Sequence, residues 1–521
     1  MEDTQVTLRD VRACDVGSSD DARVDIFVSA GVIQAVLPTG AREPRGDVIE
    51  GDGALVLPGL INAHAHSHEY FMRGQVSGLP LEPYILRISP RLAKAELPSP
   101  SDVYDRTLAT CADMLLGGIT SVADDVEHSA FTDEYVDAVL QAYQDSGLRA
   151  RVSILMEDLG WLRSIPFISE LMAPEMAVVA SGSTAFGVDE QARLSLYRRE
   201  LERWQSSRLV GLMVAPSAPQ RSSVGFLRRL WSLAEEYDVP FHIHVQESLT
   251  QAVSGPLFFG KSMVQYLDEI GCLGRRTMVA HGVWLDDADV ATLGERDATV
   301  VHNPVSNLKL GSGVARTRCL LDHGVHVALG CDGYTCNDSQ DMFEAMKFAS
   351  LLSNIASVDP DEWVGPHEAF RMATCVPALG LMESPGLQAG GRADLVVLDP
   401  FAPALLTVGK DIVGQVVFCA KRGDVRDVIV DGRLVVRNRK SLTVDVASLR
   451  GRLIGAAERF WKSASRSLDE NEKLMPYFTE AYRRSEGMLA NTGLFRLVPD
   501  QVRWRAERVR HNVPEADACE R

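Results

Sequence analysis

Short apolar segments alternate with helical patterns through the middle of the chain, and this alternation limits the fold more than any other feature. The segments are residues 59–64, 119–124, 148–155, 209–215, 240–245, 277–281, 298–302 and 325–331. They are rich in β-branched residues and apolar on both faces, as buried parallel strands are. Between them, residues 103–118 and 133–147 have helical spacing and end in glycine, a common helix terminator. The pattern predicts an α/β fold, a (β/α)8 TIM barrel. An open doubly wound sheet is the alternative, but its glycine-rich phosphate turn is missing.

Both flanks of this region have strand patterns. Before it come "TQVTLRD", "RVDIFVSAG" and "VIQAVLP", and after residue 388 come "GRADLVVLD", "QVVFCA" and "DVIVDGRLVV". The last of these contains an Asp-Gly pair that suits a hairpin turn. We therefore expect residues 1–57 and 389–445 to form one small β-sandwich and residues 58–388 to form the barrel. Residues 446–521 are expected to be a helical C-terminal extension.

Charge and composition narrow the classes of partner. A formal net charge of -18 and a pI near 5.2 argue against binding to nucleic acid or to an anionic membrane surface. No apolar stretch is long enough to span a bilayer, and the acidic N-terminus does not resemble a signal peptide. The nine cysteines are scattered and form no Cys-X-X-Cys pair, which is typical of reduced thiols. We expect a cytoplasmic protein whose partner is a small molecule.

Histidines and acids gather where the expected barrel strands end, which is where TIM barrels carry their functional groups. They are His64 and His66 at the first segment, His244 and Glu247 at the fifth, His281 at the sixth and Asp332 after the eighth. Imidazole and carboxylate are the ligands of catalytic Zn(II) or Fe(II). Residues two apart in an extended chain, such as His64 and His66, point to the same side. The pattern indicates a metal site, because chance placement of the whole set at strand ends is improbable.

Glu247 and the remaining histidines of the sequence differ in what their positions indicate. Glu247 lies three residues after His244 and is placed to move protons between an activated water and a substrate nitrogen. A lone histidine is more often an ordinary polar residue than a ligand. That interpretation applies to His68, His242, His302, His323 and His326.

The motifs together resemble those of the amidohydrolase superfamily. They are "PGLINAHAH" followed by Arg73-Gly74, then "GITSVAD", "HVQE", "VAHG", "HNPVSNLKLGSG" and "LGCDG" with "DMFEAM". The resemblance runs from about residue 50 to about residue 440. It is nearest to the cytosine deaminase-like branch, which includes S-adenosylhomocysteine/methylthioadenosine deaminases, guanine deaminases and triazine hydrolases. The combination is specific for the superfamily and much less so for any one substrate.

The resemblance implies a role for each residue. It implies that one divalent ion, Zn(II) or Fe(II), is bound by His64, His66, His244 and Asp332. It implies that Glu247 is the proton shuttle and that His281 lies beside the water and the substrate. Asp332 would also act as the base. The fourth segment, "LVGLMVAPSAP", lacks the bridging lysine of binuclear relatives, so a mononuclear site is expected. The family also implies a homodimer or a higher homo-oligomer.

Candidate substrate-binding residues follow from the same comparison. They are His68, Glu69, Arg73, Ser217, Asn303 and Asn307. Ser217 replaces the histidine that adenosine-type deaminases carry in an "APHAP" motif, which disfavours an adenosine-like substrate. His68 and Glu69 replace apolar or small residues, and either a place in the pocket or exposure to solvent fits the sequence.

The function expected from these features is metal-dependent hydrolysis of a non-peptide carbon–nitrogen bond. Deamination of a nitrogen heterocycle (a pyrimidine, purine, pterin or triazine-like ring) is the leading form. The same site could instead release an alkylamine or chloride, or open a cyclic amide or amidine. A non-catalytic scaffold is disfavoured because the ligands and Glu247 are all present. A sugar- or phosphate-processing barrel would need basic residues at the seventh and eighth strand ends, where Lys309 is the only candidate.

Overall fold

The computed structural model describes residues 5–15, 22–89, 98–126, 132–172, 190–376 and 386–492. The expected C-terminal extension is therefore described as far as residue 492, and its residues 493–521 lie outside the described part.

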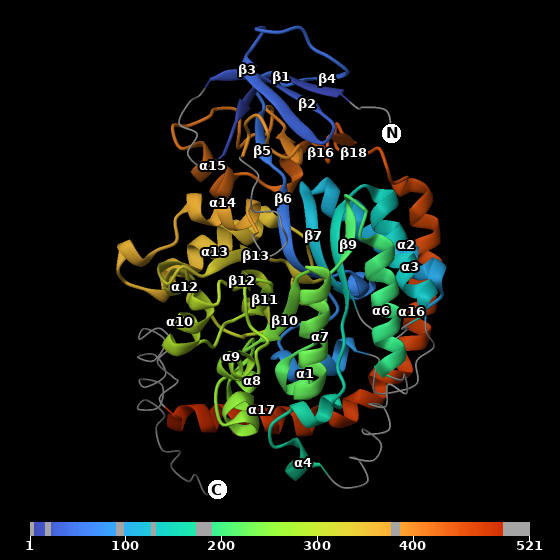
Figure 1. Cartoon of the computed structure of the whole chain (residues 1–521), viewed down its shortest axis with the longest axis vertical. Helices are drawn as coiled ribbons and strands as arrows, with labels where there is room; N and C mark the ends of the chain where they lie inside the picture. The colour runs from blue at the N-terminus through green and yellow to red at the C-terminus, as the bar shows by residue number, and fades with distance from the viewer. Residues whose placement is uncertain are drawn as a thin grey trace, which may run out of the picture.

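The centre of the molecule is the predicted TIM barrel (Figure 1). Its strands are β6 (Leu60–His66), β7 (Ile119–Val126), β8 (Arg149–Ile154), β9 (Val210–Leu212), β10 (Phe241–Val245), β11 (Thr277–His281), β12 (Thr299–His302), β13 (His326–Leu329) and β14 (Asp332–Gly333). Strands β6, β7, β8 and β9 pair in parallel in that order. Strands β10, β11, β12 and β13 do the same. A parallel bridge between Val214 and Phe241 connects β9 with β10. The eighth position is shared, because β13 pairs with β12 and β14 pairs with β6.

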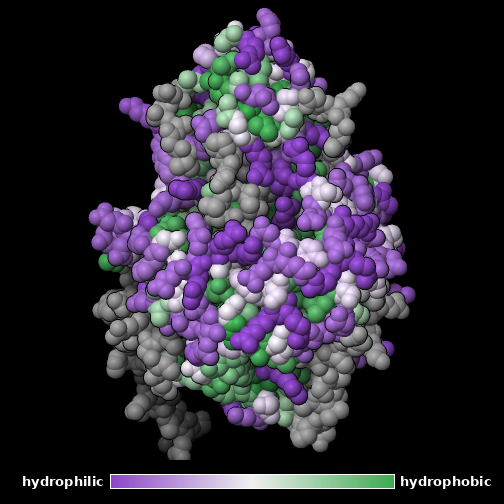
Figure 2. Space-filling model, in the orientation of Figure 1, coloured by the Kyte–Doolittle hydropathy of each residue, from purple (hydrophilic) through white to green (hydrophobic). Residues whose placement is uncertain are grey.

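Helices cover the outside of the barrel. They include α2 (Pro100–Leu116), α3 (Asp133–Ser146), α6 (Glu190–Trp204), α7 (Val224–Tyr237), α8 (Leu249–Phe259), α9 (Met263–Glu269), α10 (Asp287–Glu295), α11 (Pro304–Lys309), α12 (Thr317–Asp322), α13 (Met342–Ala356) and α14 (Pro366–Thr374). Gly147 ends α3 as predicted, in the left-handed conformation with φ 76°. Hydrophilic residues cover most of the face shown in Figure 2, as expected for helices whose apolar stripes face the strands.

Small and medium apolar side chains fill the barrel interior. They are Ile61, Ala63, Ala123, Met213, Met278, Val301, Ala328 and Val376. The larger core lies between strands and helices, where Phe226, Phe241, Phe343 and Phe370 are fully buried. This packing holds the strand ends in fixed positions, which the site above them needs.

Strands from both ends of the chain share one mixed sheet. They are β1 (Gln5–Ala13), β2 (Arg23–Ser29), β3 (Val32–Pro38), β4 (Asp47–Glu50), β5 (Leu55–Pro58), β15 (Leu395–Leu398), β16 (Val425–Val430), β17 (Arg433–Arg437) and β18 (Lys440–Ser441). Antiparallel pairing of β5 with β15 joins the two ends. The predicted Asp-Gly turn connects β16 to β17, and both Asp431 and Gly432 have positive φ.

A buried ion pair joins this sheet to the barrel. The guanidinium of Arg149, at the start of β8, donates two hydrogen bonds to Asp394, at 3.0 and 3.1 Å. Both side chains are over 90% buried. A paired, bidentate arrangement is what makes two charges tolerable at such depth.

One predicted strand is a helix. Residues 415–419 of "QVVFCA" lie in α15 (Ile412–Cys419), not in the sheet. The side chain of Asp411 caps this helix by accepting from the main-chain nitrogen of Gly414 at 2.8 Å. The β-branched residues Ile412, Val413, Val416 and Val417 are buried against the barrel core. Tertiary packing at helical spacing therefore overrides their strand propensity.

The C-terminal extension is helical over its described part. It consists of α16 (Val446–Asn471), the 3-10 helix η8 (Glu472–Leu474) and α17 (Met475–Thr492). In Figure 1, α16 runs down one side of the barrel and α17 crosses the end opposite the mixed sheet. No helix among the described residues combines the length and apolarity that crossing a membrane requires.

Candidate active site

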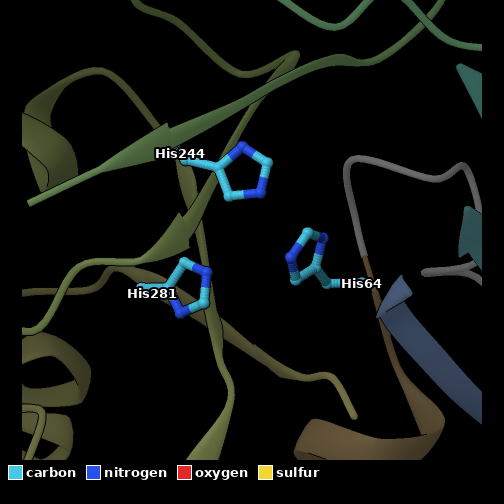
Figure 3. Close-up of side chains that lie close together, drawn as sticks. All are labelled: His64, His244 and His281. Carbon is cyan, nitrogen blue, oxygen red and sulfur yellow. The ribbon is translucent and has the colours of Figure 1, made fainter. Parts of the chain in front are cut away.

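The strand ends bring the predicted histidines and acids together at one mouth of the barrel. Figure 3 shows His64, His244 and His281 pointing toward one another from different strands. His64, His66 and Asp332 form a group whose donor atoms all lie within 4.8 Å of one another. His64 with His244 and His281 forms a second such group, and Glu247 with His281 and Asp332 a third. These overlapping groups make one compact cluster.

Main-chain carbonyls fix the orientation of two of the rings. Nδ1 of His66 lies 2.6 Å from the carbonyl oxygen of Asp125, and Nδ1 of His244 lies 2.8 Å from that of Ser217. A carbonyl only accepts, so each Nδ1 carries a hydrogen and each Nε2 is directed at the cluster. The two Nε2 atoms are 3.4 Å apart.

This arrangement fits a bound cation. Two nitrogen lone pairs facing each other at such a distance repel unless a positive charge lies between them. Burial lowers the pKa of His66, but the carboxylates of Asp332, Glu69 and Asp125 outweigh it and raise that pKa to about 9. A positive charge is therefore favoured here, and three imidazoles with one carboxylate are a donor set suited to Zn(II) or Fe(II).

Asp332 is held as a carboxylate at the centre of the cluster. Its Oδ1 lies 3.2 Å from Nε2 of His64 and accepts from the main-chain nitrogen of Gly333 at 2.9 Å. Its Oδ2 accepts from the hydroxyl of Ser306 at 2.6 Å. Burial opposes ionisation, but His64, followed by His281 and His66, lowers the pKa of Asp332 well below its usual range.

Glu247 has the opposite electrostatic character. It is 4% exposed, and burial followed by the charges of Asp332 and Glu82 raises its pKa well above the usual range. Its Oε2 lies 3.7 Å from Nε2 of His281. Two neighbouring carboxyl groups with pKa values pushed apart are the usual arrangement for separate acid and base roles.

The backbone is strained at the cluster. Gln246, His281 and Asp332 have φ of 50°, 74° and 64°, although none of them is glycine. Such left-handed conformations cost free energy and are concentrated at functional sites.

A cavity opens beside the cluster. Its polar wall includes His68, Glu69, Arg221 and Gln251. Its apolar wall includes Leu81, Tyr84, Ile85, Ile88, Trp161 and Leu310. Most of the apolar residues come from α1 (Leu81–Ile88), and Trp161 begins the 3-10 helix η3 (Trp161–Ser164).

His68 and Glu69 lie in the cavity wall, which answers the question that the sequence left open for this pair. Oε2 of Glu69 accepts from the main-chain nitrogen of Thr335 at 3.1 Å and from its hydroxyl at 2.5 Å. Gly333 permits this approach, because a Cβ there would lie 1.9 Å from Oε2 of Glu69.

The other candidate substrate-binding residues lie behind the wall or away from it. Arg73 stacks over the rings of Tyr70 and Tyr334 and is not among the cavity residues. Ser217 is fully buried, with its hydroxyl accepting from Arg221 at 3.0 Å. Asn307 Oδ1 lies 3.0 Å from Nδ1 of His281, and Nδ2 of Asn303 lies 3.4 Å from the same nitrogen. Ser217 and the two asparagines thus contact residues of the cluster.

The remaining histidines are in varied places. His242 is buried beneath the cluster, with its ring stacked on His64 at 4.8 Å between centroids. Burial, followed by the charge of His281, lowers the pKa of His302 to about 4. His323 and His326 lie on the outside, where each ring has a local partner.

Sequence reasoning missed several cavity residues. Gln251 lies four residues after Glu247 on α8 and donates to its Oε2 at 3.5 Å, so helical spacing could have identified it. Arg221, Tyr84 and Trp161 are brought to the cavity from separate loops and helices. No local pattern marks these three residues.

Comparison with known proteins agrees with this architecture. Residues 55–435 match the model of the amidohydrolase family. The 5'-deoxyadenosine deaminase of Methanothermobacter thermautotrophicus is 35% identical over 75% of this chain and 84% of its own length. The 5-methylthioadenosine/S-adenosylhomocysteine deaminase of Pyrococcus furiosus is 32% identical over 81% of this chain and 93% of its own. The solved zinc-bound adenosine deaminase of Xanthomonas campestris matches with a TM-score of 0.76 and 26% identity, over 88% of this chain and 98% of its own. The chain belongs to the amidohydrolase family.

Proposed function

We propose that this protein is a metal-dependent aminohydrolase that replaces an amino group on a nitrogen heterocycle with oxygen and releases ammonia. The observation that carries the proposal is the convergence of His64, His66, His244 and Asp332 at one strand-end mouth, with Glu247 and His281 beside them. The deaminases to which the chain is similar support the same reaction type.

His64, His66, His244 and Asp332 would hold a single divalent ion, which we propose to be zinc, with Fe(II) as the alternative. Such an ion, when bound, makes water a stronger acid and polarises a nearby electrophile. The donor set supports a mononuclear site, because "LVGLMVAPSAP" on the β9 side supplies no lysine.

The protein residues divide the proton transfers. Glu247, whose raised pKa lets it hold a proton, delivers that proton to a ring nitrogen as water adds to the amine-bearing carbon. Asp332, which is ionised because its pKa is lowered, accepts one proton from the attacking water and passes it to the amino group, which leaves as ammonia. The second proton of the water returns to Glu247 as the carbonyl of the product forms, so both carboxyl groups regain their starting states. His281 lies within 3.8 Å of both carboxylates, where its protonated form would stabilise the developing negative charge.

The residues of the cavity wall indicate which chemical groups the substrate carries. One side offers Glu69 and His68 as polar partners, and the other offers an apolar surface from α1 and Trp161. A planar ring with polar edges fits such a pocket. An aminated purine or its nucleoside is the first class to test, because the relatives act on 5'-deoxyadenosine and related nucleosides by name. The other heterocycles are the second class to test, because Ser217 replaces a histidine of adenosine-type deaminases.

The test is ammonia release by metal-loaded protein from aminated purines, pyrimidines, pterins, triazines and the nucleosides. Glu247→Gln is the blank. Glu200→Gln is the matched control, because Glu200 is similarly buried, at 5% exposed, with its pKa raised by burial, but it lies on α6. Release from one class by wild type and Glu200→Gln, and not by Glu247→Gln, supports the proposal. Products formed without ammonia would contradict it.

We also propose the division into a composite β unit of residues 1–57 and 389–445, a barrel of residues 58–388 and the extension from residue 446. The shared sheet of β1–β5 with β15–β18 supports this division. A homodimer or higher homo-oligomer is proposed from the family resemblance, and sedimentation of the purified protein tests it.

A further inference from the structure

The C-terminal extension contacts elements that form the pocket. The family match ends at residue 435, before α16 begins at Val446. Helix α17 packs against α1, α8 and α4 (Ile168–Leu171), and Figure 1 shows it running across that end of the barrel. Helices α1 and α8 both supply cavity residues, so the extension lies directly behind the cavity wall.

A stacked pair of aromatic rings connects the C-terminal extension to the cavity wall. Phe478 on α17 is fully buried, and its ring stacks on that of Trp161 with centroids 4.9 Å apart and 29° between planes. Trp161 lines the cavity. Leu86, Ile165 and Leu474 pack around the two rings. Because stacked rings constrain each other's position, Phe478 helps to hold the indole of Trp161 in place.

A second connection fixes the end of α1. The side-chain nitrogen of Asn471, which is 1% exposed, donates to the carbonyl oxygens of Leu86 and Ser89 at 2.9 and 2.7 Å. Carbonyls in the last turn of a helix have no partner within the helix. Asn471 supplies one, and the turn that it holds presents Ile88 and Ser89 to the cavity.

A third connection reaches the acid–base side. Leu489 of α17 packs with Leu249 and Val253 of α8. This helix starts two residues after Glu247 and carries Gln251, which donates to Glu247. Helix α17 therefore supports both the apolar wall of the cavity and helix α8, which lies beside the proposed proton donor Glu247.

We propose that the extension supports the outer wall of the substrate pocket from behind, with Phe478 and Asn471 as positioning residues and Trp161 as a specificity-determining residue. The part of the heterocycle or its substituent that is remote from the amino group packs against Trp161 and Ile88. This inference rests on the proposed function, since it assigns the substrate contact of the same site.

The test compares steady-state constants of full-length variants on the best substrate of the panel. Phe478→Ala is expected to raise KM about tenfold while kcat changes much less, because loss of an aromatic contact weakens binding more than chemistry. Phe478→Met, which keeps most of the volume, is expected to restore most of the loss. Asn471→Ala is expected to raise KM in the same direction.

Leu449→Ala is the matched control. Leu449 is a 2% exposed residue of α16 that packs on α2 and α3, away from the cavity. Its substitution is expected to lower the melting temperature without changing KM. An unchanged KM in Phe478→Ala, or an equal rise in Leu449→Ala, overturns the proposal.

A second readout separates this inference from the proposed function. If wild-type protein releases no ammonia from any compound, the proposed function is wrong. The positioning of Trp161 is then tested without substrate, through the tryptophan emission that Trp161→Phe removes. A shift of that emission in Phe478→Ala, and not in Leu449→Ala, supports the inference. An emission that Phe478→Ala leaves unchanged overturns it.

Discussion

The main-chain carbonyl of Ser217 lies 2.8 Å from Nδ1 of His244, so a proposed metal ligand is oriented by backbone and not by a side chain. Ser217→Ala should therefore keep the full metal content of the wild type after dialysis, whereas His244→Ala should lose it. Metal analysis by mass spectrometry measures both. Metal loss from Ser217→Ala would mean that the hydroxyl or its partner Arg221 is needed to form the site.

Glu247 can be tested without disturbing the metal. Glu247→Gln keeps the shape of the side chain but cannot exchange a proton, and kcat should fall at least about a hundredfold. Metal content and melting temperature should match the wild type. Retained turnover in Glu247→Gln would assign the proton transfers to another group.

The contact between Asn307 and His281 should matter for rate. Its Oδ1 lies 3.0 Å from Nδ1 of His281, so Asn307→Leu removes the acceptor that orients the ring. We expect kcat/KM to fall by about tenfold, as for loss of one buried hydrogen bond. Asn307→Asp keeps an oxygen acceptor and should retain more activity than the leucine variant. If the two variants are equally impaired, size or charge at this position matters and the hydrogen bond does not.

Removal of the metal should destabilise the protein. A ligand that binds only the folded state raises the melting temperature, and its removal lowers it. Dialysis against a chelator should lower the melting temperature of the wild type, and added Zn(II) or Fe(II) should restore it. His64→Ala should melt at the same temperature with and without chelator. A chelator effect of equal size in His64→Ala would place the ion elsewhere.

The attachment of α16 to the barrel should depend on pH. Arg459 donates to Asp102 of α2 from its Nε at 2.9 Å, and this hydrogen bond lowers the pKa of Asp102. A carboxyl whose folded pKa is depressed adds stability above its unfolded pKa, and that stability is lost as pH falls through the folded value. The melting temperature of Asp102→Asn should thus lie below the wild type at neutral pH. The two should approach each other below about pH 4. A difference in melting temperature that stays constant as the pH falls below about 4 would show that the ion pair does not contribute to stability.

The barrel could be predicted because its signals are local. Each parallel strand is a short apolar segment, and the residues near or just beyond its end, such as His64, His281 and Asp332, fall at fixed places in that pattern. Since parallel strands present their carboxyl ends at one mouth, placing the strands also places these side chains together.

What could not be predicted depends on contacts between distant segments. The segment containing Val416 and Val417 has strand propensity, but burial of one face and the Asp411 cap make it a helix. Trp161 carries no motif, and it lies in the cavity wall with its ring stacked on Phe478 of the distant helix α17. Glu69 could have faced solvent by sequence, and the two hydrogen bonds from Thr335 hold it in the wall.

The central claim is that this site hydrolyses the bond between a heterocyclic carbon and its amino group. The most direct measurement is turnover of the best substrate by metal-loaded protein in isotopically labelled water, with the label in the product and the ammonia released both quantified. We predict that each labelled oxygen entering the ring product is matched by one ammonia, and that Glu247→Gln gives neither. Labelled product without ammonia, or ammonia without label in the product, would contradict the account.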